Sequence, residues 1–211
     1  MIFFTSFISR FTLSLFAASL ILIAFGITII VWDWLDKNCP GCDMVMHQGQ
    51  RANFQGLNLE RVQMWQADLT GANLTSANLS NGNLSGTSFQ DANLSHADLS
   101  SAILFDADFS MATMSEADLS SAKLWKANLE GAELSGADLS NAELNGANLQ
   151  SAGLEGANLR QAWFVKADLK GANFFGAIIE NTQFGAADLT GSIWVDGSTC
   201  LERSIGVCRT E

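Results

Sequence analysis

The sequence has few of the residues on which enzymes and nucleic-acid-binding proteins depend. It contains no tyrosine, one proline and two histidines among 211 residues, which leaves few side chains for acid–base catalysis. Lysine and arginine together number 11 against 22 aspartates and glutamates, so the net charge is −11. Binding to a nucleic-acid backbone requires a basic surface. We therefore expect no nucleic-acid partner.

Motifs that mark a catalytic, cofactor or metal site are also absent. The glycines form no phosphate-binding loop, and the Gly-Gly-x-Gly-x-Asp calcium repeat does not occur. His47 and His96 have no serine, cysteine or carboxylate at a recognisable catalytic spacing. We predict a protein that is not an enzyme and that has no catalytic residue, cofactor or metal site.

The dominant feature is a repeat of five residues that runs without insertion from Ala52 to Asp196. The central residue of each unit is apolar: of the 29 centres from Phe54 to Trp194, 19 are leucine and six are phenylalanine. The residue two before the centre is alanine in 23 units, and Leu57, Val62, Thr87 and Thr182 are departures from the small residue expected there. The remaining three positions are rich in Ser, Thr, Asn, Asp and Gly.

A period of five fits neither a helix nor a flat strand. Each step of five rotates a helix by roughly 140°, which scatters the leucines around its axis, and an odd period sends them to alternate faces of a strand. Within one unit, however, the small residue and the centre are two apart, so they point the same way in an extended segment. The polar positions supply turns. We expect extended sides and turns that wind into a coil with leucine inside.

The unit, for example Ala72-Asn73-Leu74-Thr75-Ser76, resembles the A(D/N)LXX pattern of the pentapeptide-repeat family over about two thirds of the chain. The resemblance implies an all-β fold, a right-handed quadrilateral parallel β-helix with four sides to a turn. The 29 units would form about seven turns, and at about 4.8 Å between stacked turns the rod would be roughly 35 Å long. The stretch Cys39-Pro40-Gly41-Cys42 and the residues after Trp194 resemble flanking segments of exported or membrane-tethered members.

Before the repeat, residues 11–32 form an uncharged stretch of 22 residues, long enough to cross a bilayer as a helix. Arg10 precedes it, so positive-inside logic keeps the N-terminus in the cytoplasm. We predict a single-pass protein of the cytoplasmic (inner) membrane, with the β-helix on the periplasmic, extracytoplasmic side. A cleaved signal peptide or a buried soluble helix are the alternatives. The predicted parts are a cytoplasmic N-terminus (1–10), a signal-anchor transmembrane helix (11–32), a linker and N-terminal cap (33–51), the β-helix (52–196) and a C-terminal cap (197–211).

The four cysteines flank the repeat, Cys39 and Cys42 before it and Cys200 and Cys208 after it. A shared zinc site needs all four within a few ångströms, but the coil would hold the two pairs about 35 Å apart. Two local disulfides, one at each end, fit an oxidising compartment and are our interpretation. Free thiols, or a redox or metal role, remain alternatives.

Residues 20 apart should stack on one side of a four-sided coil, which assigns each outward residue to a side. On the side that contains Met64, apolar residues and lysines gather, whereas the other sides are mainly Ser, Thr, Asn, Asp and Glu. A patch with aromatic centres and a polar rim is typical of an interaction site. Self-association is one form that such an interaction could take. The alternative is that these residues cover one another or lie beneath the N-terminal segment. The predicted surface consists of Trp65, Ile103, Phe105, Lys123, Trp125, Lys126, Trp163, Val165 and Lys166.

Three aspartates, Asp98, Asp118 and Asp138, should stack on another side, about 4.8 Å from one to the next. Stacked carboxylates could bind calcium. We favour the interpretation that each carboxylate accepts hydrogen bonds from the amides of its own turn.

The leading functional hypothesis is a non-enzymatic, membrane-anchored scaffold with membrane-associated protein partners, which would serve as an accessory subunit of a membrane complex. The alternative comes from the family resemblance, because some members resemble B-form DNA in shape and negative charge and bind DNA gyrase. This chain shares the acidity and the rod. It departs from those members in its apolar N-terminal stretch, its terminal cysteines and its lack of a helical C-terminal tail.

Overall fold

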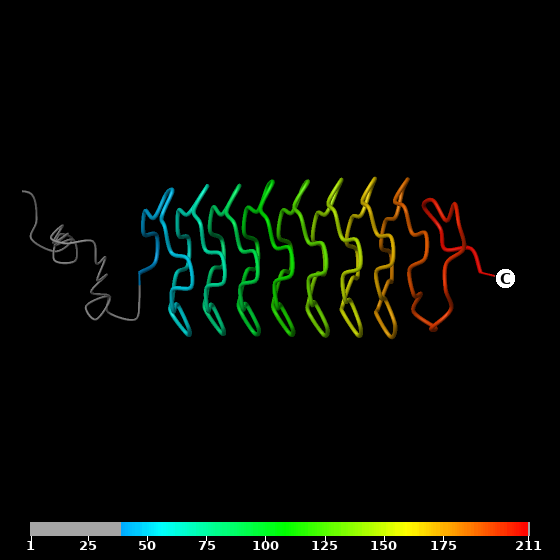
Figure 1. Ribbon diagram of the computed structural model, residues 1–211, viewed down its shortest axis with the longest axis horizontal. Helices are drawn as coiled ribbons and strands as arrows, with labels where there is room; N and C mark the ends of the chain where they lie inside the picture. The colour runs from blue at the N-terminus through cyan, green and yellow to red at the C-terminus, as the bar shows by residue number, and fades with distance from the viewer. Residues whose placement is uncertain (1–38, 211) are drawn as a thin grey trace, which may run out of the picture. The chain divides into compact units, whose positions relative to one another are not determined.

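The computed structural model of the protein describes residues 39–210. These residues form a coil of stacked turns, which runs from the blue to the red end of the ribbon in Figure 1. Within this range no residue belongs to a helix, and the strands are reduced to single bridge residues between turns. Parallel bridges join residues 20 apart, from Asp43–Gln63 to Asn173–Ile193. A bridge recurs every five residues, so each turn has four sides, and the predicted β-helix is confirmed.

Each side is held by the same kinds of backbone hydrogen bond. The N–H of Leu59 donates to the carbonyl oxygen of Asn78 at 2.7 Å, and the N–H of Asn78 donates back to the oxygen of Leu57 at 2.9 Å. At the corner between sides, the N–H of Leu57 donates to the oxygen of Phe54 at 3.1 Å, which closes a four-residue turn. Because the units repeat this pattern as far as Phe174, neighbouring turns satisfy the backbone groups along the coil up to its last turn.

From Leu59 to Ala177 the predicted inward residues form the core, whereas inward residues nearer the ends, such as Leu57, Ile179 and Phe184, are half-buried. Leu124 and its small companion Ala122 are both 0% exposed, and Phe89 and Phe109 stack inside with ring centroids 4.7 Å apart. The core is therefore a set of columns in which each apolar side chain packs on the one 20 residues away. We number the four sides in chain order by the first centre of the regular repeat, so that the first to fourth sides begin at Phe54, Leu59, Met64 and Leu69.

The corners share an unusual backbone conformation. The second residue after each centre has a positive φ from Gly41 to Gly191, and the non-glycine residues at these positions have φ between 53° and 60°. This is the left-handed conformation that the third residue of a type II turn adopts. It costs a residue other than glycine about 1–2 kcal/mol. None of the non-glycine residues at these corners is β-branched, so the sequence avoids the side chains that tolerate the conformation least.

At its N-terminal end the coil begins before the regular repeat. The N–H of Cys39 donates to the oxygen of Asn58 at 2.8 Å, within the segment for which we expected a linker and cap. Cys39 and Cys42 form a disulfide, with their Cα atoms 5.6 Å apart. The N–H of Cys42 also donates to the oxygen of Cys39 at 3.3 Å, the same bond that closes the later corners. This disulfide therefore spans the first corner of the coil.

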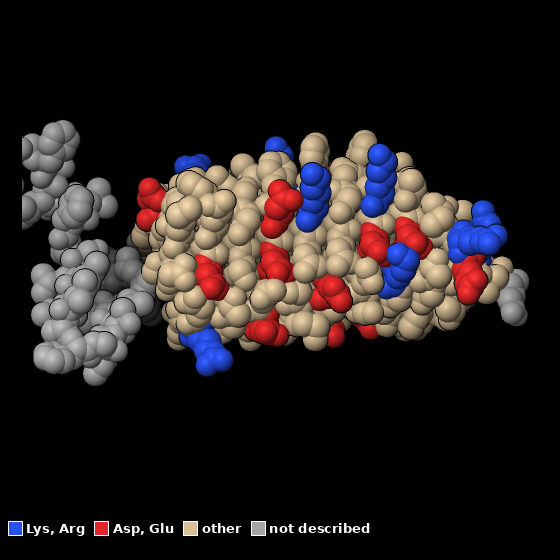
Figure 2. All heavy atoms as spheres, turned by 45° about the horizontal axis from the view of Figure 1, so that its top comes forward, with Lys and Arg blue, Asp and Glu red and all other residues tan. Residues whose placement is uncertain are grey.

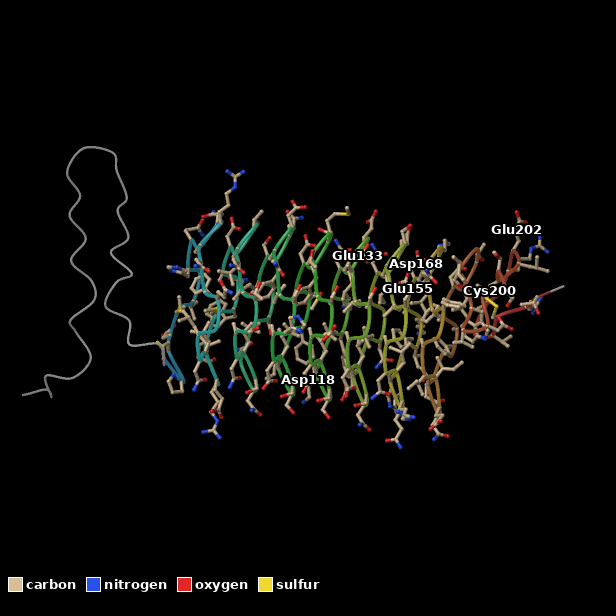
Figure 3. The ribbon with its side chains drawn as sticks, turned by 90° about the horizontal axis from the view of Figure 1, so that it is seen from below. Asp118, Glu133, Glu155, Asp168, Cys200 and Glu202 are labelled. Atoms are coloured by element: carbon tan, nitrogen blue, oxygen red, sulfur yellow. A yellow bond between two sulfur atoms is a disulfide. The ribbon has the colours of Figure 1, made fainter. Side chains whose placement is uncertain are left out.

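At the C-terminal end the chain turns back on the coil. Ile193 pairs with Thr199 and Asp188 pairs with Ile205, both in antiparallel bridges. The disulfide between Cys200 and Cys208 joins two residues of this turned-back segment, at the end of the coil where Cys200 is labelled in Figure 3. The antiparallel segment covers the last parallel rungs of the first and fourth sides, where a rung is one side of one turn.

The structure corrects the predicted localisation. A bilayer is spanned by a helix of about 20 apolar residues, which satisfies its own backbone groups. Within residues 39–210 no helix is long and apolar enough to cross a membrane. The predicted transmembrane helix at 11–32 lies outside the described residues. The assignment to the inner membrane as a single-pass protein with a periplasmic β-helix is therefore wrong on the structure in hand, and we withdraw it.

Candidate functional site

Most of the residues predicted as an interaction surface come together on the outside of the third side. Trp125 and Trp163 are 47% and 51% exposed, and the three lysines of this side are exposed as well. Ile103, Phe105 and Val165 are half-buried. We use the name aromatic patch for eight residues of this side, of which five lie on two successive rungs and three lie two rungs further on: Ile103, Phe105, Lys123, Trp125 and Lys126, then Trp163, Val165 and Lys166.

The ladder of bridges fixes the order of one column of the patch. Ile103 bridges to Lys123, Lys123 to Glu143, and Glu143 to Trp163. Each step is one rung, about 4.8 Å. The carboxylate of Glu143 therefore belongs to the same column as an ammonium group on one rung and an indole on the next.

A second column, one residue beyond the centres, holds the aromatic contact of the patch. The rings of Phe105 and Trp125 have centroids 5.8 Å apart and are inclined at 48°. The indole Nε1 of Trp125 donates a hydrogen bond to Oε2 of Glu143 at 2.6 Å. This bond joins the two columns, so the Trp125 side chain is held on one face by a ring and at its polar edge by a carboxylate.

Trp65 is not part of the aromatic patch, because Ser85 occupies the rung between it and Phe105. On the rung between Trp125 and Trp163, by contrast, Glu143 accepts a hydrogen bond from Trp125 and forms a bridge with Trp163. The structure also exposes apolar side chains on other sides, including Met111, 63% exposed, and Phe175, 57% exposed. Exposed apolar residues are thus less confined to one side than the sequence indicated. The third side is distinguished by the contact between Phe105 and Trp125 and by its three lysines.

The comparisons with known proteins agree with the repeat and the coil. The family described as "Pentapeptide repeats" matches in 8 copies, over residues 50–86, 83–120, 112–152 and 152–191. The chain belongs to the pentapeptide repeat family. A search of curated proteins finds no match.

Several solved structures of pentapeptide repeat proteins are similar to this chain. HetL of the cyanobacterium Nostoc sp. strain PCC 7120, involved in heterocyst differentiation regulation, is 32% identical over 77% of this chain and 76% of its own, with a TM-score of 0.54. A trypsin-treated form of QnrB1, a plasmid-mediated fluoroquinolone resistance protein, is 22% identical over 74% and 77%, with a TM-score of 0.37. Rfr23 of the cyanobacterium Cyanothece 51142 is 26% identical over 70% and 91%, with a TM-score of 0.25.

In this pentapeptide repeat protein the aspartates of the second side stabilise their own corners. Asp98, Asp118 and Asp138 stack in one bridged column, and Asp118 is labelled on the outside of the coil in Figure 3. Their Oδ1 atoms accept hydrogen bonds from the N–H two residues further on at 2.9, 2.8 and 2.8 Å. The local interpretation is confirmed. Across residues 39–210 no group of three or more His, Cys, Asp or Glu side chains could hold a metal ion.

Two acidic residues that lie next to Trp125 and His96 were not identified from the sequence. Glu143 lies inside the aromatic patch, and Glu116 places Oε2 3.4 Å from Nδ1 of His96 in an exposed corner column. Each stands 20 residues after a basic residue or histidine of its own column, Glu143 after Lys123 and Glu116 after His96. The 20-residue spacing that assigned the lysines and tryptophans to the third side could also have identified Glu143 and Glu116 from the sequence.

Proposed function

We propose that this chain is a non-enzymatic scaffold that binds a partner protein through the aromatic patch. The observation that carries the proposal is the adjacency of Phe105, Trp125 and Trp163 to three lysines on one side of a regular coil. Tryptophan is among the residues that contribute most to protein interfaces. Repeat coils offer extended, rigid surfaces for such contacts.

The fold itself does not require these aromatic side chains. The rungs next to Phe105 and Trp125 in their column carry Ser85 and Asn145, and the backbone pattern continues through both. The side chain of Trp125 is 47% exposed, so part of its apolar surface lies in contact with water, which is unfavourable. A serine at this position would avoid that cost. A binding function is the simplest reason to place these rings there.

The family comparison supports a role without catalysis. The similar protein HetL is involved in regulating heterocyst differentiation. We infer a comparable regulatory or structural role for this chain, in which the coil presents the aromatic patch to another protein.

The test is a double substitution, Trp125→Ser with Trp163→Ser, in the full chain. We expect the variant to keep its far-ultraviolet circular dichroism and to lose the protein that co-purifies with the unchanged chain. That protein would be identified by mass spectrometry, purified, and titrated against both chains. Binding should weaken by at least about a hundredfold, since two hot-spot residues are removed.

Phe175→Ser is the matched control. Phe175 is exposed to a similar extent but lies on the first side, so its loss should leave the affinity unchanged. Equal affinity of the double variant and the unchanged chain would refute the proposal. Sedimentation of the unchanged chain alone would show whether the patch binds a second copy instead, which would also refute it.

A further inference from the structure

The lysines of the aromatic patch differ from the fourth lysine of residues 39–210 in their ion pairing. On the face shown in Figure 2, acidic and basic side chains are both spread along the coil. Of the four lysines in residues 39–210, Lys170 lies 2.9 Å from Asp168 and 3.1 Å from Asp188. Among these residues the other three form no ion pair, and all three belong to the patch. They are Lys123, Lys126 and Lys166.

Two of these lysines define a spacing. Lys126 and Lys166 occupy the same corner column of the third side, 40 residues and therefore two rungs apart, which is about 10 Å. The rung between them carries Gly146, with φ +70°, and a Cβ added there would lie 3.8 Å from Cγ of Lys126. No side chain therefore separates the two ammonium groups.

The patch already holds one carboxylate. Oε2 of Glu143 accepts the hydrogen bond of the Trp125 indole at 2.6 Å and lies one rung from Lys123. The chemistry of this side thus accommodates a carboxylate beside an aromatic ring, while Lys126 and Lys166 still lack a counter-ion.

We propose that the partner binds the aromatic patch through an extended acidic segment, with carboxylates on Lys126 and Lys166 and apolar side chains on Trp125 and Trp163. This inference rests on the proposed function. A segment in the extended polyproline II conformation has three residues per turn and rises about 3.1 Å per residue, so residues three apart lie on one face about 9 Å apart and match the two lysines. The expected segment therefore carries Asp or Glu at every third position, with apolar residues between them.

An anionic membrane surface would also attract lysine and tryptophan, but it fits this side less well. Glu143 lies inside the patch, and Asp106 precedes Lys126 in the corner column. A continuous negative surface would meet both carboxylates, whereas a segment with separated charges avoids them.

The probe is a synthetic nine-residue peptide with Asp at every third position and Leu or Phe between, titrated against the full chain at low salt while tryptophan fluorescence is followed. The matched peptide has Asn in place of each Asp. We expect the Asp peptide to bind about five- to tenfold more tightly, as two surface ion pairs would provide. The double substitution Lys126→Glu with Lys166→Glu should reverse that preference, and Lys170→Glu, on the fourth side, should leave it unchanged.

Equal binding of the two peptides, or a preference that survives the double charge reversal, would overturn the inference. So would binding to phosphatidylserine vesicles in place of the peptide. These outcomes are separate from the test of the proposed function. If the tryptophan variant no longer binds the purified partner but the lysine variant still does, the proposed scaffold function is supported. Only the inference of an acidic segment is then refuted.

Discussion

The inside and the outside of the third side are built from the same five-residue units, yet they follow different rules. Inside, Leu104, Leu124 and Leu144 succeed one another on three rungs, and all are 0% exposed. Outside, the residue next to Leu124 is Trp125, and the same position one rung further on is Asn145. The inner columns must repeat, because each side chain packs on the one above it. The outer columns are free to vary, because their side chains need not pack on one another. An apolar residue in an outer column, where most residues are polar, is therefore a candidate for a functional role.

The largest effect should come from an inner position. Leu124→Ala leaves a cavity between two rungs, and we expect it to lower the free energy of unfolding by about 2–5 kcal/mol. Trp125→Ser, at the adjacent residue, should lower it by less than about 1 kcal/mol, because it removes one ring contact and one exposed hydrogen bond. Urea unfolding followed by circular dichroism measures both.

Leu124→Met is the control for the inner position, since it nearly conserves volume and should cost less than about 1.5 kcal/mol. If Leu124→Ala and Trp125→Ser were equally destabilising, the contrast between inner and outer columns would not hold.

The same contrast explains how far the sequence predicted the molecule. The period alone placed Leu124 inside and Trp125 outside, because every unit has the same backbone pattern and one register fixes all of them. The hydrogen bond from Trp125 to Glu143 could not be predicted in this way, since it depends on side-chain rotamers that do not repeat.

The ends of the coil were also beyond the sequence pattern. The antiparallel pairing of Ile193 with Thr199 interrupts the period, and an interrupted period carries no register to extrapolate. Likewise, the sequence did not indicate that Phe175 would be as exposed as Trp163, because exposure depends on the neighbouring rungs.

A smaller effect is expected at the corners, which lie between inner and outer positions. Ser121 has φ +58° and is exposed. Ser121→Val should lower the free energy of unfolding by about 1–2 kcal/mol, because a β-branched side chain fits the left-handed conformation poorly. Ser121→Gly should change it by less than about 1 kcal/mol, since relief of strain and the larger entropy of the unfolded chain oppose each other. Thermal unfolding compares the variants.

Ser120→Val is the matched control one residue earlier, where φ is not positive. It should stay within about 0.5 kcal/mol of the unchanged chain. A similar loss from Ser120→Val and Ser121→Val would show that the side chain, and not the corner conformation, is responsible.

The smallest effect concerns an outer ion pair and its dependence on pH. Hydrogen bonds from Thr190, with a further contribution from Lys170, lower the pKa of Asp188. Since the unfolded value is about 3.9, the stabilisation by Asp188 is fully present above that pH and is lost as the pH falls through the lower folded value. Asp188→Asn keeps an oxygen acceptor for Thr190 but loses the charge that lies 3.1 Å from Lys170. At pH 7 it should therefore lower the free energy of unfolding by less than about 1 kcal/mol.

Thermal unfolding at pH 7 and near pH 2 tests this expectation, because the difference between the unchanged chain and Asp188→Asn should shrink in acid as the aspartate becomes protonated. High salt at pH 7 is the control and should reduce the difference, since it screens an exposed pair. A difference that persisted undiminished in acid would mean that Asp188 acts through its shape and hydrogen bonds. An outer residue would then stabilise the coil as an inner one does, by its fit and not by its charge.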